Sequence, residues 1–172
     1  MTDLLSSSSW HGSDRGDPIG ALLRSLARNR AHVIVSDPSM APDCLRDPMI
    51  EGLQNEGEPL RTLDPGRPSR STRGAVLLDL PDLPVRRFWL EMRELDKRAR
   101  RGNGMVLATW QLGRPAEAEW TAWLGEVVGS VIRVREPVFD VPPEVVPTRY
   151  RIPVEVFIEG RLNSTFSLWE EI

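Results

Sequence analysis

Hydrophobic positions along the chain follow two different periods, and their alternation predicts the order of strands and helices. Residues 75–78 and 105–109 are continuous apolar runs, which are typical of strands buried on both faces of a parallel sheet. Between them, apolar residues recur at helical spacing, namely Val85, Phe88, Trp89, Met92, Leu95 and Ala99. The segment from Arg73 to Gly113 therefore predicts one strand–helix–strand unit.

The flanking segments predict further helices and strands. Asp17 and Pro18 suit the N-cap and first position of a helix, and residues 31–35 form a short apolar strand. A second short helix is expected to begin at Asp47-Pro48, because a proline inside a helix disfavours one long helix starting at residue 43. A possible short strand at 60–63 interrupts a surface loop, and a helix over 117–128 precedes a strand over 130–136.

The C-terminal segment predicts a β-hairpin. Residues 149–158 alternate, with Tyr150, Ile152, Val154, Val156 and Ile158 pointing one way. The pair Glu159-Gly160 supplies a turn, and residues 162–169 form the returning strand. The fold class expected from this order is an α/β sandwich with a mainly parallel sheet and a C-terminal antiparallel hairpin. Residues 1–16 are expected to be a flexible N-terminal segment and residues 17–172 a single domain.

Composition narrows the chemistry. The chain has 172 residues, 40% of them apolar, a formal net charge of −3, one cysteine and two histidines. These numbers suit one core, exclude an internal disulfide, and leave no spacing for a zinc site, so neither a metal nor a cofactor is expected. No export signal or membrane-spanning run is present, and we expect a cytoplasmic protein without a membrane partner.

Three segments resemble the RecA-like ATPase superfamily, including its KaiC-like and Rad51-paralogue branches, over roughly residues 12–170. Ala75–Asp79 is similar to a Walker B strand with its terminal acid, Val106–Gln111 to the next strand with its polar end, and Val128–Arg135 to the strand after the following helix. The resemblance implies a three-layer RecA-like sandwich, in which Asp79 and Gln111 occupy vestigial nucleotide-site positions. Asp79 also fits an ordinary turn acid before Pro81.

The resemblance departs from the family at the phosphate-binding loop. Such a loop requires the pattern G-x-x-x-x-G-K-[ST], whose amides and lysine hold the phosphates. The segment Gly12–Ile19 stands just before the first predicted helix, and there Asp17 and Pro18 replace the lysine and hydroxyl residues. We therefore expect a degenerate member of the superfamily that does not hydrolyse ATP and is not an enzyme.

The resulting functional hypothesis is a non-catalytic subunit or adaptor in a protein complex, linked to DNA repair, recombination or nucleic-acid remodelling. The expected partner is another protein, such as a RecA-like subunit. One alternative is a regulator that inhibits a partner by mimicking a RecA-like subunit, as truncated cell-division inhibitors resembling this superfamily do. The other is a nucleic-acid-binding accessory protein.

The nucleic-acid alternative depends on two groups of arginines. One lies on the 61–74 loop and the other at the end of the long helix, where cations also suit the helix dipole. The candidate contacts are Arg61, Arg67, Arg70, Arg73, Arg98, Arg100 and Arg101.

Aromatic residues near the chain ends are candidates for a protein interface. Trp89, Trp120 and Trp123 are expected in the core, whereas Trp10 and Trp169 are hard to bury near the chain ends. Because Pro153 cannot donate to a strand ladder, residues 149–158 are predicted to form a partly unpaired edge at which Phe157, with Trp169, docks another chain.

Overall fold

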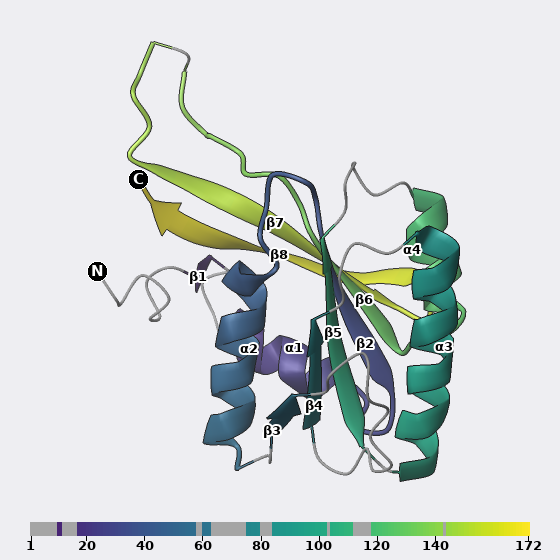
Figure 1. Ribbon diagram of the computed structural model, residues 1–172. Helices are drawn as coiled ribbons and strands as arrows, with labels where there is room; N and C mark the ends of the chain where they lie inside the picture. The colour runs from purple at the N-terminus through teal and green to yellow at the C-terminus, as the bar shows by residue number, and fades with distance from the viewer. Residues whose placement is uncertain are drawn as a thin grey trace.

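In the computed structural model the chain forms one mixed sheet of eight strands in the order β1-β8-β7-β6-β2-β5-β4-β3, with helices on both faces (Figure 1). The structure describes residues 10–11, 17–57, 60–62, 75–79, 84–102, 104–111, 118–142 and 144–172. The α/β class expected from the sequence is therefore confirmed.

Five strands form the parallel part of the sheet. The central strand β2 (Ala31–Ser36) lies between β5 (Met105–Gln111) and β6 (Ser130–Val134), and β4 (Ala75–Asp79) and β3 (Leu60–Thr62) continue the sheet beyond β5. Every residue of β2 is buried. Continuous apolar sequence therefore corresponds to strands covered on both faces, as the pattern predicts.

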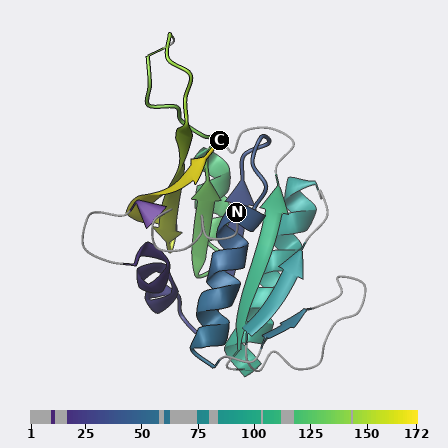
Figure 2. The ribbon, with the colours of Figure 1, turned by 90° about the vertical axis from the view of Figure 1, so that its left-hand side faces the viewer.

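The antiparallel part of the sheet is the C-terminal hairpin of β7 (Arg149–Ile158) and β8 (Arg161–Glu171), with the two-residue strand β1 (Trp10–His11) paired to β8. Both turn residues have positive φ, 51° at Glu159 and 77° at Gly160, which is the geometry of a two-residue hairpin turn. The predicted hairpin and its turn are confirmed. Figure 2 shows the hairpin at one side of the parallel strands.

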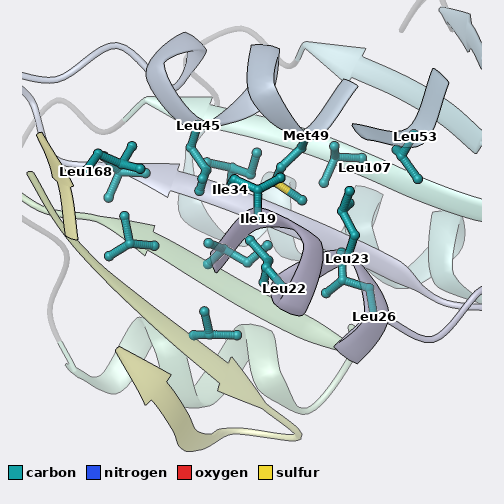
Figure 3. Close-up of a cluster of buried hydrophobic side chains, with 14 of the residues drawn as sticks. Ile19, Leu22, Leu23, Leu26, Ile34, Leu45, Met49, Leu53, Leu107 and Leu168 are labelled. Carbon is teal, nitrogen blue, oxygen red and sulfur yellow. The ribbon is translucent and has the colours of Figure 1, made fainter. Parts of the chain in front are cut away.

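One face of the sheet is covered by α1 (Pro18–Ser25) and α2 (Asp43–Asn55). The Asp17 side chain accepts a hydrogen bond from Ile19 N and caps α1, as predicted. Both helices direct leucine, isoleucine and methionine side chains onto β2, β5, β6 and the hairpin (Figure 3). The larger of the two hydrophobic clusters among the described residues forms here, and we call it the first cluster.

The expectation that Pro48 begins a second short helix was wrong, because α2 runs unbroken from Asp43 through Pro48. A proline within a helix forfeits one hydrogen bond, at a cost of about 3 kcal/mol relative to alanine. Pro48 is buried together with Leu45, Met49 and Leu53 of the same helix. Burial of this apolar face offsets the lost hydrogen bond. Sequence periodicity does not show which is larger, the free energy of burial or the cost of the lost bond.

The other face is covered by α3 (Val85–Gly102) and α4 (Ala118–Gly125). Phe88, Met92, Leu95 and Ala99 of α3 are buried, which confirms the predicted apolar stripe. Phe88 stacks on Trp110 of β5 with ring centroids 4.0 Å apart. This pair is the aromatic centre of the second cluster.

The expectation that Trp89 and Trp123 are core residues was wrong in part. Trp123 is 53% exposed and Trp89 is half-buried, while the side chain of Trp120 lies outside the described residues. Phe88 and Trp110 take the central position instead. Helical spacing alone does not show how far around the helix the sheet contact extends.

Asp96 of α3 ties the helix to the start of β2. Its Oδ1 accepts hydrogen bonds from Ala31 N at 2.9 Å and from Arg30 Nε at 2.8 Å, and its Oδ2 accepts from Arg100 Nε at 3.0 Å. The side chain is only 5% exposed. A buried carboxylate with three donors is well compensated, and its loss leaves those donors unpaired.

The predicted unpaired edge at β7 was also wrong, because β7 pairs with β6 on one side and β8 on the other. Pro153 O accepts from Arg135 N. In an antiparallel ladder a residue's nitrogen and oxygen point to the same neighbour, so the nitrogen of Pro153 points toward the β6 side, just past Val134, where β6 ends. The proline is therefore accommodated inside the sheet.

We expect Asp96→Ala to lower the free energy of unfolding by about 3 kcal/mol, because it leaves Arg30 and Ala31 N–H without their acceptor in a buried position. The matched control is Glu94→Ala on the same helix, which removes an exposed ion pair with Lys97 and should cost less than about 0.5 kcal/mol. Urea denaturation of both variants measures the difference. Equal losses would contradict the assignment.

His32 makes the fold sensitive to acid. It is fully buried, Nε2 lies 2.8 Å from Ala27 O, and desolvation by burial lowers its pKa from 6.5 to about 4. The folded state therefore favours the neutral imidazole. The stability gained is complete above pH 6.5 and is lost as the pH falls toward 4.

Between pH 7 and pH 5 the protein should lose about 2 kcal/mol more stability than the His32→Gln variant, since glutamine does not titrate and keeps an N–H donor for Ala27 O. Denaturant titrations at both pH values measure this double difference. Parallel losses in the two proteins would show that His32 does not titrate on unfolding.

Candidate functional site

The candidate site lies at the carboxyl ends of the parallel strands, where open α/β sheets bind their ligands. From β2 the chain continues to β3 at one edge of the sheet, and from β6 it continues to β7 in the direction of the other edge. The strand order therefore reverses direction between the neighbours β2 and β6. The loop at this point is residues 37–42, between β2 and α2.

The 37–42 loop is closed on itself. Asp37 N donates to Val134 O at 3.0 Å, and Met40 N donates to Asp37 O at 2.9 Å across a tight turn. From the end of β5, Gln111 Nε2 donates to Pro38 O at 3.2 Å and to Met40 O at 3.1 Å. The amides of Asp37 and Met40 and the carbonyls of Asp37, Pro38 and Met40 are thus bonded within the protein.

The carboxylate of Asp37 is buried beneath the loop. Its Oδ1 lies 3.5 Å from Nη2 of Arg133 on β6, and both side chains are mostly buried. The Nε of Arg133 is buried without a hydrogen-bond partner among the described residues. The charges of Asp37 and Arg133 thus largely neutralise each other at this edge of the sheet.

A groove of about 780 Å³ opens beside this ion pair on the face of β6, β7 and β8. Arg133, Glu155 and Thr165 stand side by side across the three strands, and Pro153 and Ser167 form the next row. The side chains of Pro153 and Ser167 are short, which leaves space for the groove above the strands at this row. Arg135 pairs with Glu155 at 3.0 Å, and the groove presents neutralised ion pairs that suit a polar protein surface.

The predicted nucleotide-site positions are partly brought together. Asp79 ends β4 beside Thr109 of β5, two residues before Gln111, although the Asp79 side chain lies outside the described part. The segment Gly12–Ile19, compared above with a phosphate-binding loop, does not follow the central strand β2 in the chain. It leads into α1, whereas the loop that follows the central strand is 37–42, and only the strand order reveals this.

Of the seven candidate arginines, the structure describes the side chains of three. Arg98, Arg100 and Arg101 are exposed at the end of α3, where Arg100 pairs with Asp96. Arg61 belongs to β3, but its side chain lies outside the described part, as do Arg67, Arg70 and Arg73 entirely.

The three aromatic interface candidates differ in their surroundings. Phe157 is half-buried against the second cluster beneath α3 and α4, so it supports the core. Trp169 is half-buried with the Arg149 guanidinium 4.6 Å from its ring. Trp10 belongs to β1, and its side chain lies outside the described residues.

A projecting arm was missed by the sequence analysis. We define the arm as residues 136–142 and 144–148, which connect β6 to β7 and extend beyond the sheet (Figures 1 and 2). It carries Val146 at 84% exposure. The signal was available in the run VPPEVVP, which combines three prolines with three valines that fit neither a helical nor a strand period.

Cys44 is not poised for nucleophilic chemistry. It packs against the first cluster, and burial raises the pKa of its thiol to about 12. Because the thiolate is the reactive form, this cysteine acts as a small apolar side chain at neutral pH.

No protein-family model matches the chain, and a search of the curated proteins also found no match. Among the described residues, no helix combines the length and hydropathy needed to cross a membrane.

Gln111→Glu should destabilise the protein by about 1–3 kcal/mol, because a carboxylate would face the carbonyls of Pro38 and Met40 that now receive an amide. Gln54→Glu on the exposed side of α2 is the matched control and should change stability by less than about 0.5 kcal/mol. Thermal or urea unfolding compares them. If both variants unfold alike, Gln111 does not hold the loop closed.

Proposed function

We propose that this chain is a non-catalytic RecA-like domain that serves as a subunit or adaptor in a protein complex, linked to DNA repair, recombination or nucleic-acid remodelling. Two features of the sheet support the RecA-like assignment. The central strand β2 is followed by a loop and a helix, the arrangement of phosphate-loop proteins. Asp79 and Gln111 end neighbouring strands at the same edge, as the resemblance implies.

The closed 37–42 loop is the observation that carries the non-catalytic half of the proposal. A phosphate cradle needs free amides, glycines that let the backbone approach the phosphate, and a lysine. The segment Asp37–Pro42 contains two prolines and neither glycine nor lysine. The carbonyls of Pro38 and Met40 accept from Gln111, and Asp37 is paired with Arg133, so the segment supplies no cation of its own to a phosphate.

Exposed apolar groups support the interaction half of the proposal. Val145 and Val146 on the arm, and Trp123 on α4, are at least half exposed. Exposed apolar groups that contribute little to the core commonly mark protein contact sites. Binding surfaces on a domain with a closed phosphate loop suit a subunit or adaptor better than an ATPase.

The purified protein should show no binding of Mg-ATP by titration calorimetry at ligand concentrations of about 1 mM, and no hydrolysis above the buffer rate. The physical reason is the 37–42 loop, whose hydrogen bonds within the protein leave no cradle of amides for the phosphates. Micromolar affinity that is lost in Asp79→Ala would contradict the proposal, because it would show a working nucleotide site at this edge. The same affinity retained in Asp79→Ala would place the nucleotide elsewhere and would equally count against it.

A further inference from the structure

The base of the arm is held rigidly against β7. Val138 N donates to Arg151 O at 2.7 Å and Arg151 N donates back to Val138 O at 3.0 Å. The Arg151 guanidinium also donates two hydrogen bonds to the Asp140 carboxylate, from Nε to Oδ2 at 2.7 Å and from Nη2 to Oδ1 at 3.4 Å. A ring contact between Phe139 and Tyr150 adds to these bonds. The arm therefore leaves the sheet in a defined direction.

The far part of the arm is also ordered by hydrogen bonds but is exposed. Val145 N donates to Pro142 O at 3.0 Å, and Ile172 N at the chain end donates to Thr148 O at 2.9 Å. Val145 is 50% and Val146 84% exposed. A preorganised apolar tip loses little conformational entropy when it enters a groove, which favours binding.

The chain has an apolar pocket on its opposite side. Trp89 of α3 and Trp123 of α4 line a pocket of about 380 Å³ together with Arg86 and Glu126. Trp89 Nε1 donates to Trp123 O at 3.0 Å, which fixes the two helices relative to each other. The Arg93 guanidinium lies 5.6 Å from the centroid of the Trp89 ring. The pocket is thus preformed.

We propose that the arm of one copy of this chain docks into the Trp89–Trp123 pocket of a second copy. This inference rests on the proposed role in an assembly and names the partner: the chain itself. The arm extends beyond the β7–β8 hairpin, whereas the pocket lies on α3 and α4, which cover one face of the sheet (Figure 1). The arm and the pocket of one molecule therefore lie apart. Contact between copies is therefore head to tail.

Charge complementarity identifies the second copy as the occupant. Residues 136–148 contain Glu136, Asp140 and Glu144 and no basic residue. Among the described residues, Arg86 and Glu126 line the pocket, and the Arg93 guanidinium lies over the Trp89 ring, so two arginines stand against one carboxylate. Asp140 is paired with Arg151, so Glu144 beside the valines is the acidic group at the arm's tip, and it complements Arg86 and Arg93 at the tryptophan-lined pocket. Such complementarity also speeds encounter and sets register.

A head-to-tail contact uses two different surfaces and leaves one arm and one pocket free at the ends of each pair, so it extends to a ring or a chain of copies. Light scattering or sedimentation over a concentration series should show a mass that rises above the monomer at concentrations on the order of 100 µM. A wild-type protein that remains monomeric there overturns the proposal.

Single substitutions test each surface. Val146→Asp on the arm and Trp123→Ala in the pocket should each weaken self-association at least tenfold, about 1.4 kcal/mol, with unchanged circular dichroism. The alanine variant keeps the backbone carbonyl that accepts from Trp89. Leu162→Asp is the matched control, an apolar residue 56% exposed at the other end of the hairpin, and should associate like wild type. Equal weakening in the control overturns the proposal.

Mixing distinguishes a head-to-tail contact from a symmetric one. The Val146→Asp chain keeps an intact pocket and the Trp123→Ala chain keeps an intact arm, so an equimolar mixture should form a dimer that grows no further. A mixture that stays monomeric overturns the proposal. Glu144→Arg should weaken association, and adding Arg86→Glu to the same chain should restore it; failure of this rescue also counts against the arrangement.

The failure of self-association is distinguishable from failure of the proposed function. A monomeric chain without ATP binding retains the adaptor role with a different partner and refutes only the arm-to-pocket contact. A self-associating chain that binds ATP at Asp79 refutes the non-catalytic role and leaves the contact intact.

Discussion

The carboxylate of Asp96 is the contact on which the central strand depends. It accepts from Ala31 N and Arg30 Nε where β2 begins, and it reaches Arg100 on its own helix. A strand buried along its whole length needs partners for its first backbone groups as much as for its middle. Asp96 of α3 is the partner of Ala31 N, and this bond helps to position α3 along the strands of the sheet. The Phe88–Trp110 stack, one face of the core and the position of the Trp89–Trp123 pocket follow from that placement.

The far end of β2 is closed by a different set of bonds. Gln111 bridges the carbonyls of Pro38 and Met40, and Asp37 is held between Val134 O and Arg133. The side chains of Asp37 and Gln111 and the amides of Asp37 and Met40 are thus used to stabilise the loop itself. Among the described residues, the projecting and hollow surfaces lie elsewhere: the arm, the groove on the hairpin face and the tryptophan pocket.

The arm illustrates how a connection becomes a surface. The chain must pass from β6 to its antiparallel neighbour β7, and a two-residue turn would suffice. Instead the connection extends beyond the sheet, and Arg151 of β7 binds both the backbone of Val138 and the side chain of Asp140. The bonds stabilise the base while leaving the valines in water. Exposed valines contribute little to the isolated fold, which leaves them available for the contact that we propose for the arm.

The sequence by itself determined the types of the elements, because helix and strand periods are local properties. The α1 cap at Asp17, the stripe of α3, the apolar strands β2 and β5 and the Glu159-Gly160 hairpin turn all follow from neighbours within a few residues. Tertiary structure alone decided the strand order, and with it that residues 37–42 rather than 12–19 follow the central strand. It also kept Pro48 inside α2 through burial, placed Pro153 where β6 ends, and left Trp123 in solvent. Each of these outcomes depends on contacts between segments distant in sequence, whose energies no local pattern contains.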